Sequence, residues 1–254
     1  MDNMPESAPA PRKLICFETY WGDHDTRLFQ NTSVLPFLQA LSSQLHPPLL
    51  VAHRFVESAD HLSSYTAYPG GLLWQDPEVF DVPVYYLSFH GSPGGLRSSL
   101  EHVAGGLLCQ SFEGWGTKYS NLIHFGACSV FSGAQGEQFA REFLAASCCK
   151  AITGYSRDVD WMDSMVTDLL FLKRFFSDSD PWRNLRTIYE SVLADFAPAR
   201  SLGFQLYEAE APSSARRADE PVRAIAAATT SEPTQPRGLF ASIAGWLRRS
   251  RETS

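Results

Sequence analysis

The sequence predicts an α/β fold: a three-layer sandwich in which helices cover both faces of a mainly parallel sheet. Short apolar segments typical of strands alternate with longer segments whose apolar residues recur at helical spacing, which is the pattern of a sheet covered by helices. The chain has 254 residues, of which 44% are hydrophobic and 17 are Phe, so it can bury a large core. We expect this domain to span residues 13–210.

Six strands are predicted from apolar runs that are bounded by Gly, Pro or polar residues. Residues 82–89 (VPVYYLSF) are typical of a strand that is buried on both faces of a sheet. The predicted strands are 13–21, 49–56, 82–89, 119–127, 151–155 and 204–208.

Helices are predicted between these strands. Asn31 or Ser33 is expected to cap the first helix, which carries Pro36 in its first turn, where Pro is tolerated. Pro181 marks the start of the last helix. Loops are expected at residues 22–30 and in the Gly- and Pro-rich stretch 91–95. The predicted helices are 34–45, 60–68, 99–112, 136–147, 162–176 and 182–196.

The two ends of the chain differ from this domain in composition. Residues 1–12 predict a disordered tail without the basic and apolar regions of a secretory signal. Residues 211–237 are rich in Ala, Ser, Thr, Pro and Arg and predict a flexible linker. Residues 238–250 predict a short amphipathic helix with a basic end. That helix is expected either to dock on an anionic membrane or a protein groove or to be an end without function.

Charge and cysteine content limit the class of protein. The formal net charge is −7, divided into +3 for residues 211–254 and −10 for the rest, which argues against nucleic acid as a partner of the domain. The five cysteines are odd in number and show no CxxC spacing, so a disulfide framework has little support. A reducing cytoplasm is expected, with no metal and no cofactor. The loop residue His24 between two Asp predicts polar surface rather than a metal ligand.

Two residues with reactive side chains follow the ends of predicted parallel strands. His90 follows VPVYYLSF and Cys128 follows LIHFGA, and ligand sites form beyond the carboxyl ends of such strands. A neighbouring His can activate a Cys nucleophile. Gly91 lets its backbone N–H approach a substrate carbonyl, and with the N–H of Cys128 it would form an oxyanion hole. The alternative is that either residue is an ordinary core or surface side chain. His124 is expected to be a hydrogen-bonded core or rim residue, and Cys148 and Cys149 at a helix end are expected to be buried packing residues.

The motifs Phe89-His90-Gly91 and Gly126-Ala127-Cys128-Ser129 resemble those of the caspase-like cysteine peptidases, which include caspases, metacaspases, legumains and CHAT-domain proteins. The segments ICFETYW, SVLPFLQAL, FHGSPGGL, IHFGACS and ITGYSRDVDWMDS are similar to those of a small stand-alone bacterial family of this fold. The resemblance implies a caspase-like sheet and hydrolysis of a peptide bond in a peptide or protein substrate. It also implies that His90 is the general base and acid and that Cys128 is the nucleophile. The alternative is a catalytically inactive module of the same fold that binds a peptide or protein partner.

The sequence departs from this family around the cysteine. Ser129-Val130 follows Cys128, and Gly126 stands where metacaspases carry the Asp that shapes their basic specificity, so substrate preference does not carry over. The sequence argues against an α/β-hydrolase, because no GxSxG or GxCxG motif is present and no His follows Cys128, the last one being His124.

The resemblance implies that the segment after strand 151–155 forms a wall of the primary specificity pocket. Asp158, Asp160 and Asp163 would attract a basic side chain there, and Trp161 would pack against its stem. The alternative is that Asp160 or Asp163 caps the following helix.

Overall fold

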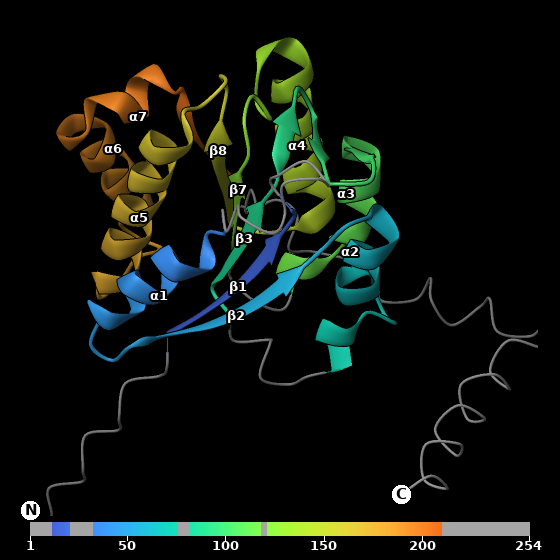
Figure 1. Cartoon of the computed structure of the whole chain (residues 1–254), viewed down its shortest axis with the longest axis horizontal. Helices are drawn as coiled ribbons and strands as arrows, with labels where there is room; N and C mark the ends of the chain where they lie inside the picture. The colour runs from blue at the N-terminus through green and yellow to red at the C-terminus, as the bar shows by residue number, and fades with distance from the viewer. Residues whose placement is uncertain (1–11, 21–32, 76–81, 118–120, 210–254) are drawn as a thin grey trace, which may run out of the picture. The chain divides into compact units, whose positions relative to one another are not determined.

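Six strands form one sheet in the order β2-β1-β3-β7-β8-β9 (Figure 1). All neighbours in this sheet pair in parallel except β8 and β9, which are antiparallel. The strands are β1 (Arg12–Glu18), β2 (Leu49–Phe55), β3 (Val84–Ser88), β7 (Leu122–Gly126), β8 (Ala151–Tyr155) and β9 (Phe204–Glu208). All six predicted strands are therefore present, several of them shorter than expected.

The structure is a computed structural model that describes residues 12–20, 33–75, 82–117 and 121–209. The predicted N-terminal tail up to residue 11, the loop 22–30, the linker 211–237 and the helix 238–250 lie outside the described residues. Within the described part, no helix is long and apolar enough to cross a membrane.

Helices cover both faces of the sheet. On one face lie α1 (Leu35–Ser43), α5 (Trp161–Ser177), α6 (Leu185–Asp195) and α7 (Ala197–Ser201), and on the other α2 (Ala59–Thr66), α3 (Gly105–Ser111) and α4 (Gly133–Ser147) (Figure 1). Successive strand side chains point to opposite faces, so Tyr85 packs into one core and Tyr86 into the other. The predicted α/β sandwich with a mainly parallel sheet is confirmed.

A small second sheet replaces part of a predicted helix and loop. It consists of β4 (His90–Ser92), β5 (Gly95–Arg97) and β6 (His102–Ala104) in antiparallel order. The loop predicted at 91–95 is wrong because Gly94, with φ +70°, makes a tight turn that lets β4 pair with β5. The helix predicted over 99–112 is wrong in its first half, because Ser98 exchanges hydrogen bonds with Glu101 and closes a turn before β6.

Helix ends account for the other differences. The N-cap of α1 is Val34, not Asn31 or Ser33, although Pro36 lies in the first turn as predicted. The last long helix, α6, begins at Leu185 because residues 181–184 form a turn, and α7 was not predicted. Two short 3-10 helices, η1 (Leu72–Gln75) and η3 (Trp115–Thr117), complete the described elements.

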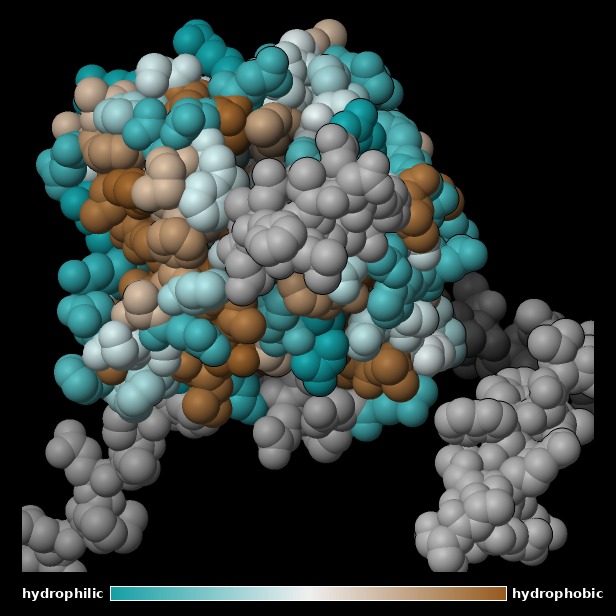
Figure 2. Space-filling view, in the orientation of Figure 1, coloured by the Kyte–Doolittle hydropathy of each residue, from teal (hydrophilic) through white to brown (hydrophobic). Residues whose placement is uncertain are grey.

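Apolar side chains also reach the surface on the side of α1 and α5, where Figure 2 shows hydrophobic residues gathered. Met162 and Val166 of α5 are exposed there, at 51% and 36%. Trp161, the first residue of the same helix, lines a cavity.

Candidate active site

The parallel register of β3 and β7 places His90 and Cys128 at equivalent positions along the two strands. Val84 pairs with Leu122 and Ser88 with Gly126, so paired residues are 38 positions apart in the chain. His90 and Cys128 are also 38 positions apart, and each follows the last paired residue of its strand by two positions. Both therefore stand beyond the carboxyl ends of adjacent strands, where sites of open parallel sheets form. Both are partly buried.

Gly91 brings the main chain after His90 directly against Cys128. A Cβ atom on Gly91 would lie 1.8 Å from the carbonyl oxygen of Cys128 and 2.8 Å from its nitrogen, so only glycine fits here. Among the described residues, the N–H of Cys128 has no hydrogen-bond acceptor, whereas that of Ser129 donates to the carbonyl of Arg157 at 2.9 Å. The chain after Cys128 turns sharply, since Ser129 has φ 53°.

The other four cysteines lie in different environments. Burial raises the pKa of Cys16 well above its usual value, that of Cys109 to about 11 and that of Cys149 to about 12. These thiols stay protonated at neutral pH. Cys148 is exposed at the left-handed end of α4 and does not line the cavity beside Cys128, so the expectation of a buried packing residue is wrong for Cys148 and confirmed for Cys149. Cys128 is therefore the cysteine that combines partial exposure with a cavity.

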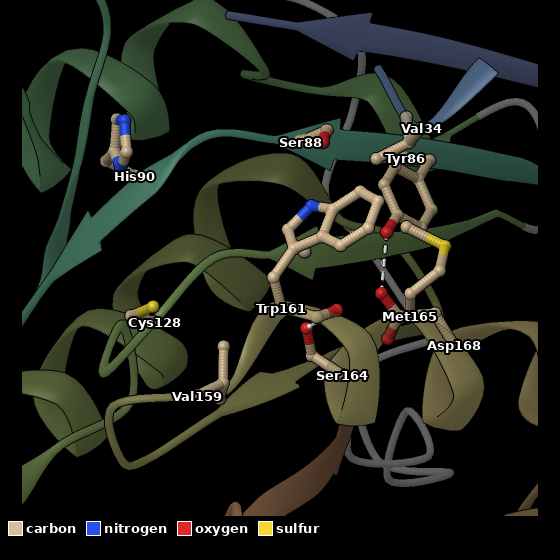
Figure 3. Close-up of a pocket in the computed structure, with 11 residues that line it drawn as sticks. Val34, Tyr86, Ser88, His90, Cys128, Val159, Trp161, Ser164, Met165 and Asp168 are labelled. Carbon is tan, nitrogen blue, oxygen red and sulfur yellow. Dashed lines mark hydrogen bonds between the residues drawn. The ribbon is translucent and has the colours of Figure 1, made fainter. Parts of the chain in front are cut away.

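A cavity of about 210 Å³ opens beside Cys128 (Figure 3). It is lined by Val34, Tyr86, Ser88, His90, Gly126, Cys128, Val159, Trp161, Ser164, Met165 and Asp168. Figure 3 shows His90 and Cys128 at one end, Tyr86 and Asp168 at the other, and Trp161 between them. The cavity thus leads from the two strand ends back along the sheet toward α5.

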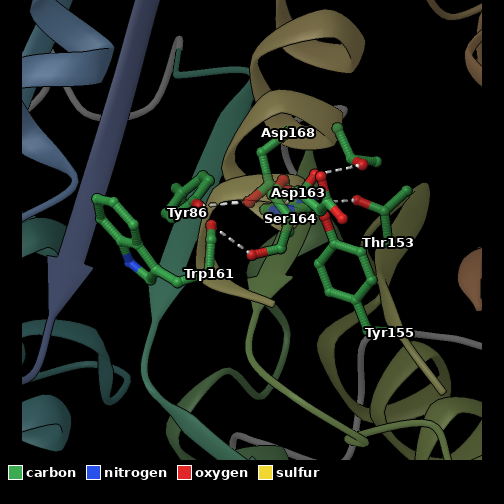
Figure 4. A network of polar contacts seen from close by, with 9 residues as sticks. Tyr86, Thr153, Tyr155, Trp161, Asp163, Ser164 and Asp168 are labelled. Atoms are coloured by element: carbon green, nitrogen blue, oxygen red, sulfur yellow. Dashed lines mark hydrogen bonds and ion pairs between the residues drawn. The ribbon is translucent and has the colours of Figure 1, made fainter. Parts of the chain in front are cut away.

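A buried carboxylate, Asp168 of α5, closes the far end of the cavity (Figure 4). Its Oδ2 accepts a hydrogen bond from Tyr86 Oη at 2.6 Å, and its Oδ1 accepts one from Tyr155 Oη at 2.5 Å. His124 Nε2 lies 2.9 Å from Oδ1, although poorly aligned, and its Nδ1 lies 2.8 Å from Thr153 Oγ1. Burial, and then the nearby Asp168, raise the pKa of both tyrosines well above its usual value, so both hydroxyls remain donors.

Sequence reasoning missed Asp168, although one signal for it existed. The acid stands within a mostly apolar helical run, SMVTDLLFL, on the same helix face as Met165 and Leu172. An acid on a buried helix face requires partners. For His124, the prediction of a hydrogen-bonded core residue is confirmed.

Two polar atoms of the cavity lining have no hydrogen-bond partner among the described residues. Ser88 is fully buried and its Oγ makes no hydrogen bond to any described residue, and the same holds for Trp161 Nε1. Buried polar groups are nearly always paired, so two unpaired ones in a single cavity point to a ligand or to water.

The residues predicted to bind substrate separate into two groups. Trp161 lines the cavity together with His90 and Cys128, and its ring packs edge-on against Phe37 at a centroid distance of 5.3 Å. Asp160 caps α5 by accepting hydrogen bonds from the N–H groups of Met162 and Asp163, and Asp158 accepts one from Ser129 Oγ at 2.7 Å. Neither Asp158 nor Asp160 lines the cavity, so their role in substrate binding stays a prediction.

Glu18, at the end of β1, fixes the cavity wall at Val34. The carboxylate is fully buried and accepts hydrogen bonds from the Val34 N–H at 2.8 Å and from Ser33 Oγ at 2.7 Å. His53 Nε2 of β2 lies 2.6 Å from it. These contacts hold the start of α1 against two strands.

No protein-family model and no curated protein matches this sequence. Solved structures similar to this chain include caspase-1 from Spodoptera frugiperda, with a TM-score of 0.41 and 11% sequence identity. That match covers 82% of this chain and 94% of the caspase chain.

Proposed function

We propose that this chain is a cysteine peptidase of the caspase-like type that hydrolyses a peptide bond with the His90/Cys128 dyad. The observation that carries the proposal is that both residues follow the paired ends of adjacent strands and line one cavity. A peptide or protein is therefore the expected substrate. No metal or cofactor is part of the proposed chemistry.

The reaction follows from the residue types. His90 accepts the thiol proton of Cys128, and the sulfur attacks the substrate carbonyl carbon. The oxyanion is stabilised by the N–H of Cys128, which has no acceptor among the described residues, and by the N–H of Gly91. The intermediate collapses to a thioester as His90 gives its proton to the leaving amine. Water, deprotonated by His90, then attacks the thioester, and the proton returns to the sulfur as the acid product leaves.

The choice of cysteine is supported by the environment of the other four. Three are held as thiols by burial, and Cys148 lies at the end of α4, outside the cavity. Labelling at Cys128 in preference to the exposed Cys148 is therefore a specific test of activation.

The experiment is modification of the full chain with a peptide acyloxymethyl ketone, followed by mass spectrometry of the labelled peptides. We expect labelling at Cys128, its loss in His90→Ala, and its retention in Cys148→Ala. Equal labelling of Cys128 in wild type and in His90→Ala would contradict the dyad. Absence of labelling, together with tight binding of a peptide, would instead favour an inactive peptide-binding module.

A further inference from the structure

The cavity beside Cys128 is lined by one acid, Asp168, whose only charged neighbour among the described residues is the poorly aligned Nε2 of His124 at 2.9 Å. Of the described residues that line it, Asp168 is an acid, and neither Lys nor Arg is present. Asp168 is only 2% exposed, and a buried charge is costly unless a partner offsets it. A positively charged group in the cavity would add a partner beside His124, whereas an acidic group would be repelled.

Asp168 has room for one more donor. An ionised carboxylate offers about four acceptor sites. Among the described residues, Tyr155 donates to Oδ1, with His124 Nε2 nearby, and Tyr86 is the one donor to Oδ2. One acceptor site on Oδ2 therefore remains for a ligand.

The depth of the cavity selects for a long side chain. Tyr86 precedes His90 by four residues, so the two lie about 13 Å apart along an extended strand. The five bonds from Cα to Nζ of Lys span roughly 6 Å, and a hydrogen bond adds about 3 Å. A Lys or Arg side chain that starts beside Cys128 therefore covers about 9 Å of this length, whereas Asp, Asn or Ser covers much less.

The walls suit such a side chain along its length. Val34, Val159 and Met165 are apolar, as is the hydrocarbon stem of a basic residue. Ser88 lies midway between His90 and Tyr86 along the chain, and its unpaired Oγ offers an acceptor. In Figure 3 the nitrogen of Trp161 lies on the side of the ring away from the Tyr86–Asp168 hydrogen bond, so its N–H does not oppose the charge.

We infer that Asp168 is the specificity-determining residue of this site and that the cavity takes a Lys or Arg side chain of the peptide attacked by Cys128. The inference rests on the proposed function and adds its substrate class: cleavage after a basic residue.

The test uses three peptide acyloxymethyl ketones that differ only in the residue before the reactive carbon: Lys, norleucine or Glu. Norleucine matches the stem of Lys without its charge. With wild-type protein, we expect Cys128 to react roughly 10- to 100-fold faster with the Lys probe than with norleucine, and slowest with Glu. Equal rates for Lys and norleucine, or a faster rate for Glu, would overturn the inference.

Asp168→Asn should lower the Lys rate to about the norleucine rate, while Glu137→Gln, which removes an exposed acid on α4, should leave the preference unchanged. Circular dichroism checks that Asp168→Asn is folded; where it is not, the wild-type rates decide. If no probe modifies Cys128, the proposed function fails. Calorimetry of Cys128→Ala with the matching non-reactive peptides then tests whether the cavity prefers a basic side chain. Tighter binding of the Lys peptide supports the inference, and equal binding refutes it.

Discussion

The two ends of the cavity are held in different ways. At the rim, His90, Gly91 and Cys128 lie on chain that has just left the large sheet, and the main chain of Gly91 packs against that of Cys128. At the buried end, Asp168 and Tyr86 belong to regular elements and are joined by side-chain hydrogen bonds. The proposed dyad thus lies just beyond the paired part of two strands, and the proposed specificity residue lies where side chains hydrogen-bond one another within regular elements.

The largest expected effect is a difference in the free energy of unfolding between variants at the two ends of the cavity. Asp168→Ala removes the acceptor of two buried hydroxyls and the partner of His124, so we expect the free energy of unfolding to fall by about 3–5 kcal/mol. Cys128→Ala, at the partly exposed rim, should change it by less than about 1 kcal/mol. Urea unfolding measures both variants, and similar losses would remove the distinction.

Gly91→Ala tests the main-chain contact at the rim. The added methyl group would overlap the carbonyl oxygen of Cys128, so we expect a loss of about 1–3 kcal/mol and slower modification of Cys128. Gly106→Ala is the matched control, because nothing lies within 4 Å of a Cβ at that position of α3. Unchanged stability of Gly91→Ala would mean that the two segments are not in contact.

Tyr155→Phe perturbs the buried end without touching the cavity lining. The hydroxyl donates to Asp168 Oδ1 and to the carbonyl of Ser164, so its removal should cost about 1–2 kcal/mol. Tyr155 does not line the cavity, so the preference for the Lys probe should persist. Loss of that preference would show that the network, rather than Asp168 itself, selects the substrate.

The smallest expected effect is that of alkaline pH on the free energy of unfolding. Tyr86 and Tyr155 have raised pKa values when folded, whereas an unfolded Tyr titrates near 10. Above pH 10 the unfolded state therefore binds fewer protons, and stability falls as pH rises. Between pH 9 and 10.5 we expect Tyr155→Phe to lose about 1 kcal/mol less than wild type in urea unfolding. Identical pH dependence would contradict the role of burial.

The same contrast explains what the sequence could predict. His90 and Cys128 each end a strong apolar strand, so a local pattern places both at one edge of the sheet. Tyr86 and Asp168 are 82 residues apart, and their meeting depends on how α5 packs on the sheet. Asp160 illustrates a further limit, because an acid before a helix fits both a cap and a binding site, and only its hydrogen bonds identify it as a cap.

The small sheet escaped prediction for a related reason. Residues 91–95 have the composition of a loop, and their pairing depends on partners in β5 and β6 rather than on propensity. The strands of the large sheet needed no such partner to be recognised, because their burial is encoded in their own apolar residues.

The parallel register of β3 and β7 has a consequence for sequence variation. His90 is six positions beyond Val84, and Cys128 is six beyond Leu122, the first paired residues of the two strands. Insertions or deletions in the connection between the strands would leave both side chains in place. One residue added inside either strand would turn its reactive side chain to the opposite face. Homologues should therefore vary in the number of residues between His and Cys. The six positions from the first paired residue of each strand to its His or Cys should stay constant.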